Sequence, residues 1–375
     1  MMQPDTKSFF SVVIGFRNRE ISRIEFVLEA LSKQTFKDFE LVFVDYGSDA
    51  EIQKEAEQLV SSYDFAKYLY SDTRGWFWNR SHALNTGIRQ AAGDVVVISD
   101  IDLIFPLDFL ESVNELSFKN TFYTFNCHYL SANTDYSNVT EKDLEKSVIN
   151  YVGLCAIAKD DLTSIDCFDE YYLNWGGEDD DLYVRLENSG CKKQQMKVDK
   201  FPVLHQWHER QSPSYPTPWY LDMVTYLYSI APDKKTDDKQ YGLLVETSER
   251  AVLDRLNEER CFKKLELFPN PLFQFNLFLD GFFKMESGGL GQFDFPIEQP
   301  LPQGRKHKLV EKINNQLSKL KFPYQLQKKI SNIPVHSRQT WIDFVQYFIG
   351  KNRAFVYDYY LINTDNKLAL LFQKK

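Results

Sequence analysis

Several features are scarce or missing in this sequence. Cysteine occurs only five times in 375 residues, an odd count, and no C-x-x-C pair occurs. A disulfide framework or a cysteine-rich zinc site is therefore not expected, and a reducing compartment fits better. The N-terminal stretch MMQPDTKSFF has no apolar segment typical of a secretion signal, and no apolar run approaches the ~20 residues that span a bilayer. We expect a cytoplasmic protein.

Positive net charge is also missing. The formal net charge is −9, which argues against nucleic-acid binding. Hydrophobic residues make up 43% and charged residues 26%, as in an ordinary globular chain, and the length suffices for two domains. Aromatic residues are frequent at 15%, which fits either a large core or surfaces that grip sugar faces.

Strands and helices are predicted to alternate in the first hundred residues, in an α/β fold. Apolar, β-branched runs predict buried strands at 9–16, 39–47, 66–72 and 94–102, and helical spacing predicts helices at 21–34, 50–63 and 79–93. This repeat favours a mostly parallel sheet with helices on both faces, and ligands then bind beyond the carboxyl ends of the strands. Neither G-x-G-x-x-G nor a P-loop motif occurs, so no dinucleotide site is supported.

The pattern changes along the second half of the chain. From about residue 120 strands and helices mix, and we place a domain boundary near 240, with 1–240 catalytic and 241–375 an α+β accessory region of unknown role. The segment 305–329 is basic, with leucines at helical spacing. It either docks on an anionic membrane or forms a solvated helix face. A strand hairpin is predicted to turn at 363–366.

Four consecutive acids stand in the stretch NWGGEDDDLYVRL, residues 174–186. Acids suit the first turn of a helix, so a helix is predicted to begin near Glu178, with Asp181 paired to Arg185 four residues on. That explains one or two of the acids. The excess indicates a partner such as a metal, a sugar or a proton, although a purely structural role stays open.

Two further groups suit a metal ion. Asp100 and Asp102 close a predicted strand, where residues i and i+2 point the same way and can share a hard cation or a ribose hydroxyl. His205 and His208 follow another predicted strand and can ligate a transition metal as neutral imidazoles. Together with the oxygens of a diphosphate, these donors would suit Mn²⁺ better than zinc. The alternatives are an ordinary D-x-D pair and surface histidines.

Polar residues follow the first two predicted strands. Arg17 and Arg19 can fork onto a phosphate, or pair with local acids on the surface. Asp45 ends the second strand, where its carboxylate can accept the N–H of a uracil ring or simply stabilise a turn.

Together and in this order, these segments resemble the metal-dependent, inverting glycosyltransferases of the GT-A fold, and within them the β-1,4-galactosyltransferases and their GalNAc-transferring relatives. VVIGFRNRE is similar to the family motif PFRNR, with Gly15 in place of proline. WNRSHALNTGIRQA resembles its FNRAxLLNxGxxEA helix, and VVISDIDLIF resembles FxFSDVDLIP. WGGEDDD is the most specific signature and is intact. The resemblance covers residues 9 to about 216; nothing in 240–375 is recognised.

The resemblance implies a role for each matching position. Asp179 would be the general base, Asp102, His205 and His208 would hold Mn²⁺ or Mg²⁺, and Asp180 would bind the acceptor. Trp175 would stack on a sugar of donor or acceptor. The uridine diphosphate sugar would be bound by the remaining residues: Phe16, Arg17, Arg19, Asp45, Asp100, Asn150, Gly153 and Glu178.

Two departures from the family pattern bear on specificity. His205 stands where the family often has a methionine ligand, which makes the site harder and leaves Mg²⁺ as plausible as Mn²⁺. Asn150 stands where galactosyl enzymes have a bulky tyrosine against the donor 2-position, so an N-acetyl group would fit. We therefore expect UDP-GalNAc to be tolerated beside UDP-Gal.

The implied activity is transfer of a hexose or N-acetylhexosamine to a glycan or lipid-linked glycan acceptor, in the synthesis of a bacterial surface polysaccharide. Three alternatives stay open: a chondroitin-type polymerising transferase that uses UDP-GlcA or UDP-GlcNAc, a non-catalytic sugar-nucleotide or glycan-binding module, and an interaction scaffold built on the C-terminal region.

Overall fold

The structure, a computed structural model, divides into two units, Met1–Glu249 and Arg250–Lys375. This division lies after the boundary predicted near residue 240. The accessory role of the C-terminal region stays a prediction. The residues described are 9–136, 138–144, 153–174, 176–197, 200–209, 223, 241–258, 261–264, 281–295 and 338–375.

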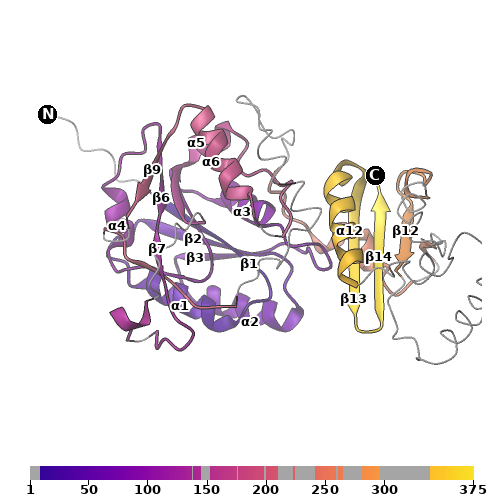
Figure 1. The fold of residues 1–375 in the computed structure, drawn as a ribbon, viewed down its shortest axis with the longest axis horizontal. Coiled ribbons are helices and arrows are strands. Elements are labelled where there is room, and N and C mark those ends of the chain that lie inside the picture. The colour runs from indigo at the N-terminus through magenta and orange to yellow at the C-terminus, as the bar shows by residue number, and fades with distance from the viewer. Residues whose placement is uncertain are drawn as a thin grey trace, which may run out of the picture. The chain divides into compact units, whose positions relative to one another are not determined.

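The first unit is built on a seven-stranded mixed sheet in the order β3-β2-β1-β4-β8-β6-β9 (Figure 1). The first four strands in this order are mutually parallel, β8 runs antiparallel to both β4 and β6, and β9 is parallel to β6. The strands are β1 (Phe10–Phe16), β2 (Phe39–Asp45), β3 (Ala66–Tyr70), β4 (Val95–Ser99), β6 (Thr121–Phe125), β8 (Cys155–Ala158) and β9 (Lys192–Met196). The predicted mostly parallel α/β sheet is confirmed.

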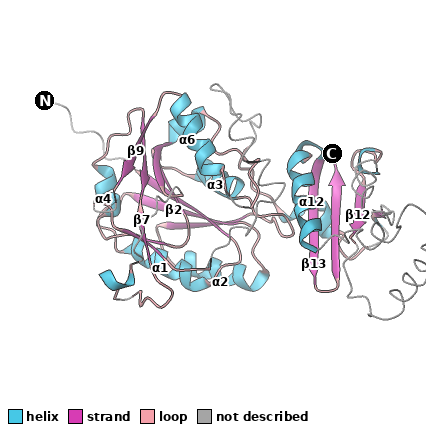
Figure 2. Cartoon of the chain, viewed as in Figure 1, coloured by secondary structure: helices cyan, strands magenta, loops and turns pink. Residues whose placement is uncertain are grey.

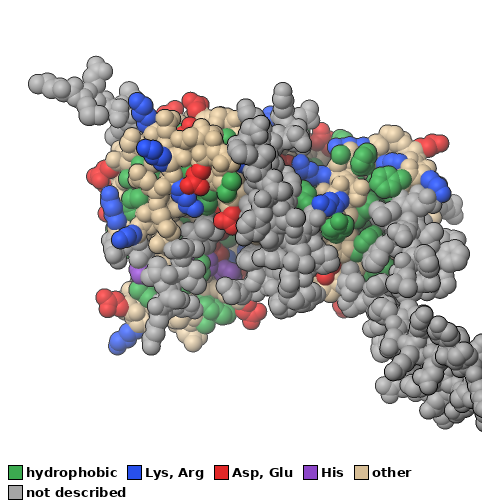
Figure 3. All heavy atoms as spheres, turned by 45° about the horizontal axis from the view of Figure 1, so that its top comes forward, with side chains coloured by type: hydrophobic (Ala, Val, Ile, Leu, Met, Phe, Trp, Pro, Cys, Tyr) green, Lys and Arg blue, Asp and Glu red, His purple; other side chains and the backbone are tan. Residues whose placement is uncertain are grey.

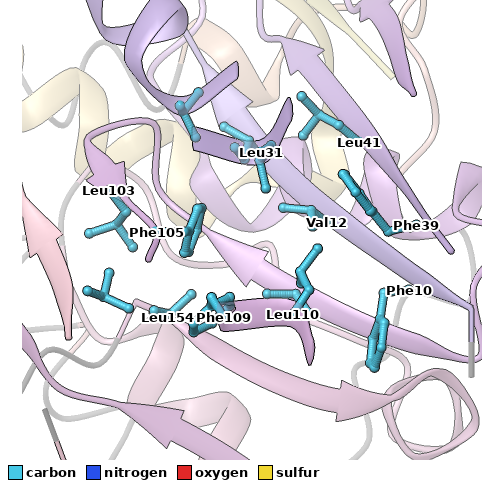
Figure 4. Packing of buried hydrophobic residues seen from close by; sticks show 14 of the residues in the cluster. Phe10, Val12, Leu31, Phe39, Leu41, Leu103, Phe105, Phe109, Leu110 and Leu154 are labelled. Atoms are coloured by element: carbon cyan, nitrogen blue, oxygen red, sulfur yellow. The ribbon is translucent and has the colours of Figure 1, made fainter. Parts of the chain in front are cut away.

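Helices cover both faces of this sheet (Figure 2). The even-numbered residues of β1 pack with α1, α2 and α4 in one core, while Val13 faces the other core with α3 and α6. This alternation is the period of a strand buried on both faces. Figure 4 shows Val12, Leu31 and Phe109 within the first core. The helices are α1 (Ile21–Ser32), α2 (Ala50–Val60), α3 (Arg80–Gln90), α4 (Phe109–Asn114), α5 (Lys159–Ser164) and α6 (Glu178–Asn188).

A second, three-stranded sheet lies in the same unit, in the order β5-β10-β7. Its strands are β5 (Leu103–Ile104), β7 (Cys127–Tyr129) and β10 (Val203–His205), and the one-turn helices η1 (Glu141–Asp143) and η2 (Thr247–Glu249) lie outside the sheets. This small sheet brings together three segments that are far apart in the sequence.

The second unit has an α+β composition, as predicted. Its sheet has the order β11-β12-β14-β13, and β13 and β14 form the predicted hairpin. Arg250 and Asp358 form a buried ion pair, with 2.8 Å between Nε and Oδ1. The elements are α8 (Ala251–Asp254), β11 (Lys263–Lys264), β12 (Leu290–Asp294), α12 (Arg338–Lys351), η4 (Arg353–Phe355), β13 (Val356–Thr364) and β14 (Lys367–Lys374).

Within the described part of the chain, no helix is both long and apolar enough to cross a bilayer. The basic segment 305–329, predicted as a helix that contacts a membrane, lies outside the described residues.

Candidate functional site

Pairing in the small sheet places the first group of candidate residues. β10 runs antiparallel to β5 with His205 opposite Leu103, and the amide of Gln206 donates to the carbonyl of Asp102 at 2.8 Å. On the other side, Tyr129 of β7 is in register with His205, and the two rings stack with centroids 4.5 Å apart. Asp102 and His205, about a hundred residues apart in sequence, are thereby held side by side.

Asp102, His205 and His208 form the one cluster of possible metal ligands found among the described residues. One donor atom from each lies within 4.8 Å of the others. Oδ2 of Asp102 is 3.2 Å from Nε2 of His208, and Oδ1 is 3.6 Å from Nε2 of His205. The three residues predicted to hold the metal therefore meet in the structure. Figure 3 shows histidine and acidic side chains on the surface of the first unit.

The chemistry of this cluster fits a divalent cation. Oδ1 of Asp102 is buried and accepts no hydrogen bond within the part of the chain that the structure describes. Burial opposes ionisation of Asp102, but the hydrogen bond from His208 and the two imidazoles outweigh it and lower the pKa of the carboxyl. Nδ1 of His208 lies 2.8 Å from the carbonyl of Glu209. Donation to that carbonyl leaves Nε2 as the ligating nitrogen.

Helix α6 places the second group. It begins at Glu178, as predicted, after Gly176 and Gly177 in positive-φ conformations (95° and 97°). A Cβ on Gly177 would lie 2.8 Å from Cε1 of Tyr172, so both the backbone and the space there call for glycine. Helical periodicity then points the four acids in different directions.

The predicted pair of Asp181 and Arg185 is present and buried. Oδ2 of Asp181 accepts from Nε of Arg185 at 2.7 Å, and Nη1 of Arg185 donates to the carbonyl of Ile165 at 2.8 Å. The side chains are 0% and 1% exposed. Asp181 is therefore structural, whereas Asp180 is exposed to solvent.

Arg80, at the start of α3, contacts the first two acids of α6 and also Asp100. Its Nε donates to Oδ1 of Asp100 at 2.8 Å, Nη1 to Oδ1 of Asp179 at 2.8 Å, and Nη2 to the carbonyl of Gly153 at 3.0 Å. Glu178 lies 3.8 Å from Nη1. Arg80 was not among the site residues predicted from the sequence. Its place at a helix start beyond the carboxyl edge of the sheet was the signal that could have found it.

Burial dominates the electrostatics at the start of α6. It raises the pKa of Asp179 to about 8; Arg80 opposes this rise, and Glu178 and Asp100 add to it. Burial likewise raises the pKa of Glu178, again against Arg80. A carboxylate with a raised pKa is a stronger base than an ordinary one, which is the property a general base needs.

One sequence prediction about Asp100 and Asp102 is wrong. The strand predicted over 94–102 ends at Ser99, and residues 101–102 form a turn. The alternation rule for extended chains therefore does not apply to these two residues, and a shared ligand stays a prediction. Asp100 bonds to Arg80, while Asp102 contacts the histidines.

The residues at the end of β1 and just after it, predicted to bind the donor diphosphate, contact other parts of the chain in the structure. Phe16 is buried in the core. Arg17 donates to the carbonyls of Trp76 at 2.8 Å and Thr73 at 3.4 Å, and so holds the loop before α3. Arg19 is half-buried and makes no hydrogen bond or ion pair to any residue that is described. Their roles toward a donor stay predictions.

Asp45 is fully buried and its oxygens are engaged. Oδ1 accepts from the amide of Ser48 at 2.9 Å, and Oδ2 accepts from the hydroxyl of Tyr68 at 2.8 Å. Burial raises the pKa of this carboxyl. The geometry is that of a turn residue, the alternative interpretation, and contact with a uracil ring stays a prediction.

Gly15, where the family has proline, lies against α3. A Cβ there would be 3.1 Å from Cβ of Ala83 and 3.4 Å from Cη2 of Trp78. The absent side chain leaves room for the Trp78 indole. Of the remaining predicted residues, Gly153 contacts Arg80 through its carbonyl. Asn150 and Trp175 lie outside the described residues.

Two family models match adjoining parts of the first unit. Residues 11–146 match glycosyl transferase family 2, and residues 138–209 match the N-terminal domain of galactosyltransferase. The second match contains the acids of α6 and both histidines, and the first contains Arg80 and Asp102.

Among curated relatives, the chain is 28% identical over 171 residues to β-1,4-galactosyltransferase 1 of Bos taurus, covering 44% of this chain and 38% of that protein. It is 25% identical over 241 residues to chondroitin sulfate N-acetylgalactosaminyltransferase 2 of Homo sapiens, covering 57% and 42%. The chain thus spans about two fifths of the length of these relatives.

A solved structure of GalNAc-T7 with UDP, GalNAc and Mn²⁺ is similar at 20% identity with a TM-score of 0.46, covering 59% of this chain and 48% of that one. The two family models point the same way. Residues 11–209 are similar to glycosyltransferase family 2 and to the galactosyltransferases.

Proposed function

We propose that this chain is a metal-dependent, inverting glycosyltransferase that moves a hexose or N-acetylhexosamine from a UDP-sugar to a glycan hydroxyl. One observation carries the proposal. Arg80 joins Asp100 to Asp179, so the segment that bears Asp102 lies beside the start of α6. A cation site next to a buried carboxylate base suits displacement of a diphosphate by a hydroxyl.

Asp102, His205 and His208 would hold the cation, Mn²⁺ or Mg²⁺, which when bound neutralises charge that develops on the departing diphosphate. Asp179 takes the proton of the acceptor hydroxyl as that oxygen attacks C1 of the donor sugar. The new C1–O bond forms on the face opposite the breaking bond to the diphosphate. Configuration therefore inverts in one step, and UDP leaves with the bonding electron pair.

The other acids divide between the two substrates. Glu178 and Asp100, both beside Arg80, are proposed to face the donor sugar, together with the backbone at Gly153. Asp180 is exposed one residue beyond the base and is proposed to bind the acceptor. Trp175 is proposed to stack on a sugar ring.

For the donor we propose UDP-GalNAc or UDP-Gal. Asn150 supports the first, because it is smaller than the tyrosine of galactosyl enzymes. The names of the two relatives include one galactosyl and one N-acetylgalactosaminyl transferase. A competition assay in which UDP-Gal is used and UDP-GalNAc is excluded would contradict the inference from Asn150.

The test is release of UDP from UDP-GalNAc, UDP-Gal, UDP-GlcNAc, UDP-Glc and UDP-GlcA, with and without Mn²⁺, followed by a screen of acceptor sugars. We expect release from UDP-GalNAc or UDP-Gal only with the metal. Release confined to UDP-GlcA or UDP-GlcNAc would favour the chondroitin-type alternative. Donor binding without any release would favour a non-catalytic binding module.

We further propose that the enzyme works at the cytoplasmic face of a bacterial membrane on a lipid-linked acceptor for a surface polysaccharide. The basic segment 305–329 supports this, because each Lys or Arg near an anionic surface contributes up to about 1 kcal/mol. Co-sedimentation with liposomes should then require anionic lipid. Equal binding to neutral liposomes, or none, would contradict the membrane contact.

A further inference from the structure

We propose that Arg80 is the positioning residue of this site, holding the carboxyl of Asp179 in place and favouring its ionised form. The inference rests on the proposed role of Asp179 as general base. It also explains how Glu178 and Asp179, at the start of α6, remain close to Asp100, which follows β4.

The guanidinium of Arg80 is held by three segments at once. Its Nε, Nη1 and Nη2 each donate to a different partner: Asp100 after β4, Asp179 on α6 and the carbonyl of Gly153 before β8. The side chain is only 11% exposed. Because the group is planar and all three nitrogens are engaged, it cannot rotate without losing bonds. The hydrogen bond from Nη1 therefore fixes the direction of Oδ1 of Asp179.

Among the residues that the structure describes, Arg80 is the cation that faces Asp179. The acids around Asp179 are Glu178 and Asp100, and both disfavour its ionisation. Two other titratable groups face it: Cys155 of β8, whose pKa burial raises to about 12, and Tyr183 of α6, whose pKa burial also raises. Both stay neutral near pH 7 and supply no positive charge. Ionisation of Asp179 therefore depends on Arg80.

The balance matters for catalysis. A general base works best when its pKa lies near the operating pH, so that it is ionised and still takes a proton. Burial among acids alone would leave Asp179 protonated and unable to accept the proton of the acceptor hydroxyl. Arg80 offsets part of that effect.

The experiment uses two variants of the full chain. Arg80→Gln removes the positive charge, and Arg80→Lys keeps the charge but loses the planar guanidinium that donates to three partners. Arg89→Gln is the matched control, since Arg89 lies in the last turn of the same helix, about 13 Å along its axis, and bonds to the carbonyl of Tyr241. Thermal unfolding checks that each variant is folded. Asp179 is titrated by the ¹³C signal of its labelled carboxyl carbon, assigned through Asp179→Asn.

We expect the titration midpoint of Asp179 to rise by about one unit or more in Arg80→Gln, because a neighbouring arginine commonly lowers a carboxyl pKa by that much. Arg80→Lys should give a smaller rise and Arg89→Gln none. The acid limb of kcat/KM for UDP release should move to higher pH in the same order.

An unchanged midpoint in Arg80→Gln, with only the donor KM raised, would overturn the inference and leave Arg80 a donor contact. The carboxyl titration does not require turnover. If the wild type releases no UDP from any donor, the proposed function fails, while the midpoints still decide whether Arg80 controls Asp179.

Discussion

Nε2 of His208 lies 3.2 Å from Oδ2 of Asp102, and this contact raises the pKa of His208 above its ordinary value. Without a cation, Asp102 therefore favours a proton on Nε2 of His208, the same nitrogen that would ligate the cation. The proton and the metal compete for the same imidazole nitrogen, so the affinity of the site depends on pH.

Binding of Mn²⁺ should weaken as the pH falls. Below the raised pKa His208 is protonated and the metal must displace that proton, whereas above it Nε2 is free to ligate. Calorimetric titration between about pH 5.5 and about pH 8 should show affinity that rises with pH and then levels off. A dissociation constant that does not change over this range would contradict the ligand role of His208.

Asp102→Asn tests the ligand role of Asp102 by the same calorimetric titration of Mn²⁺. It keeps the shape of the side chain but removes the charge of the ligand, so Mn²⁺ affinity should drop by at least about 100-fold, the upper range for loss of a residue that merely supports a ligand. Unchanged affinity would place the metal elsewhere.

Substitutions of Asp181 and Asp180 should differ sharply in their effect on the stability of the protein. Asp181→Ala leaves the buried guanidinium of Arg185 without its carboxylate, and breaking a buried pair in this way costs about 3–5 kcal/mol. Asp180→Ala alters an exposed side chain and should change the free energy of unfolding by no more than about 0.5 kcal/mol. Chemical denaturation of both variants measures this, and equal losses would refute the division of tasks among the four acids.

Ionisation of Asp179 should lower the stability of the folded protein at alkaline pH. Its pKa is raised to about 8 by burial, so between the ordinary carboxyl range and that value the folded state binds a proton that the unfolded state has lost. Stability from this group is therefore present at low pH and is lost as the pH rises through the folded-state pKa. Asp179→Asn removes the effect, and its melting temperature relative to wild type should increase from pH 5 to pH 9, by about 2–4 °C per kcal/mol. A gap that shrinks with pH would contradict the raised pKa.

The local features of the fold could be predicted from sequence. Apolar, β-branched runs placed β1 and β2, and helical spacing placed α1, close to their observed bounds. The pairing of Asp181 with Arg185 follows from helix geometry alone, since residues four apart share a face.

Contacts between residues far apart in the sequence could not be predicted from it. The three partners of Arg80 lie 20, 73 and 99 residues away, so no spacing rule reveals them. The turn at residues 101–102 comes directly before β5, whose partner β10 lies about a hundred residues further along the chain. The residues alone left His205 and His208 open between metal ligands and surface histidines, and their meeting with Asp102 required the fold.

The turnover of Asp179→Asn tests the central claim most directly. UDP release is measured with donor, metal and an acceptor sugar, and donor binding is measured separately by calorimetry. We predict that donor affinity stays within about twofold of wild type, while turnover falls by about 10²-fold or more, the contribution of a general base. Near-normal turnover with intact donor binding would contradict the assignment of Asp179 as the base of a glycosyl transfer.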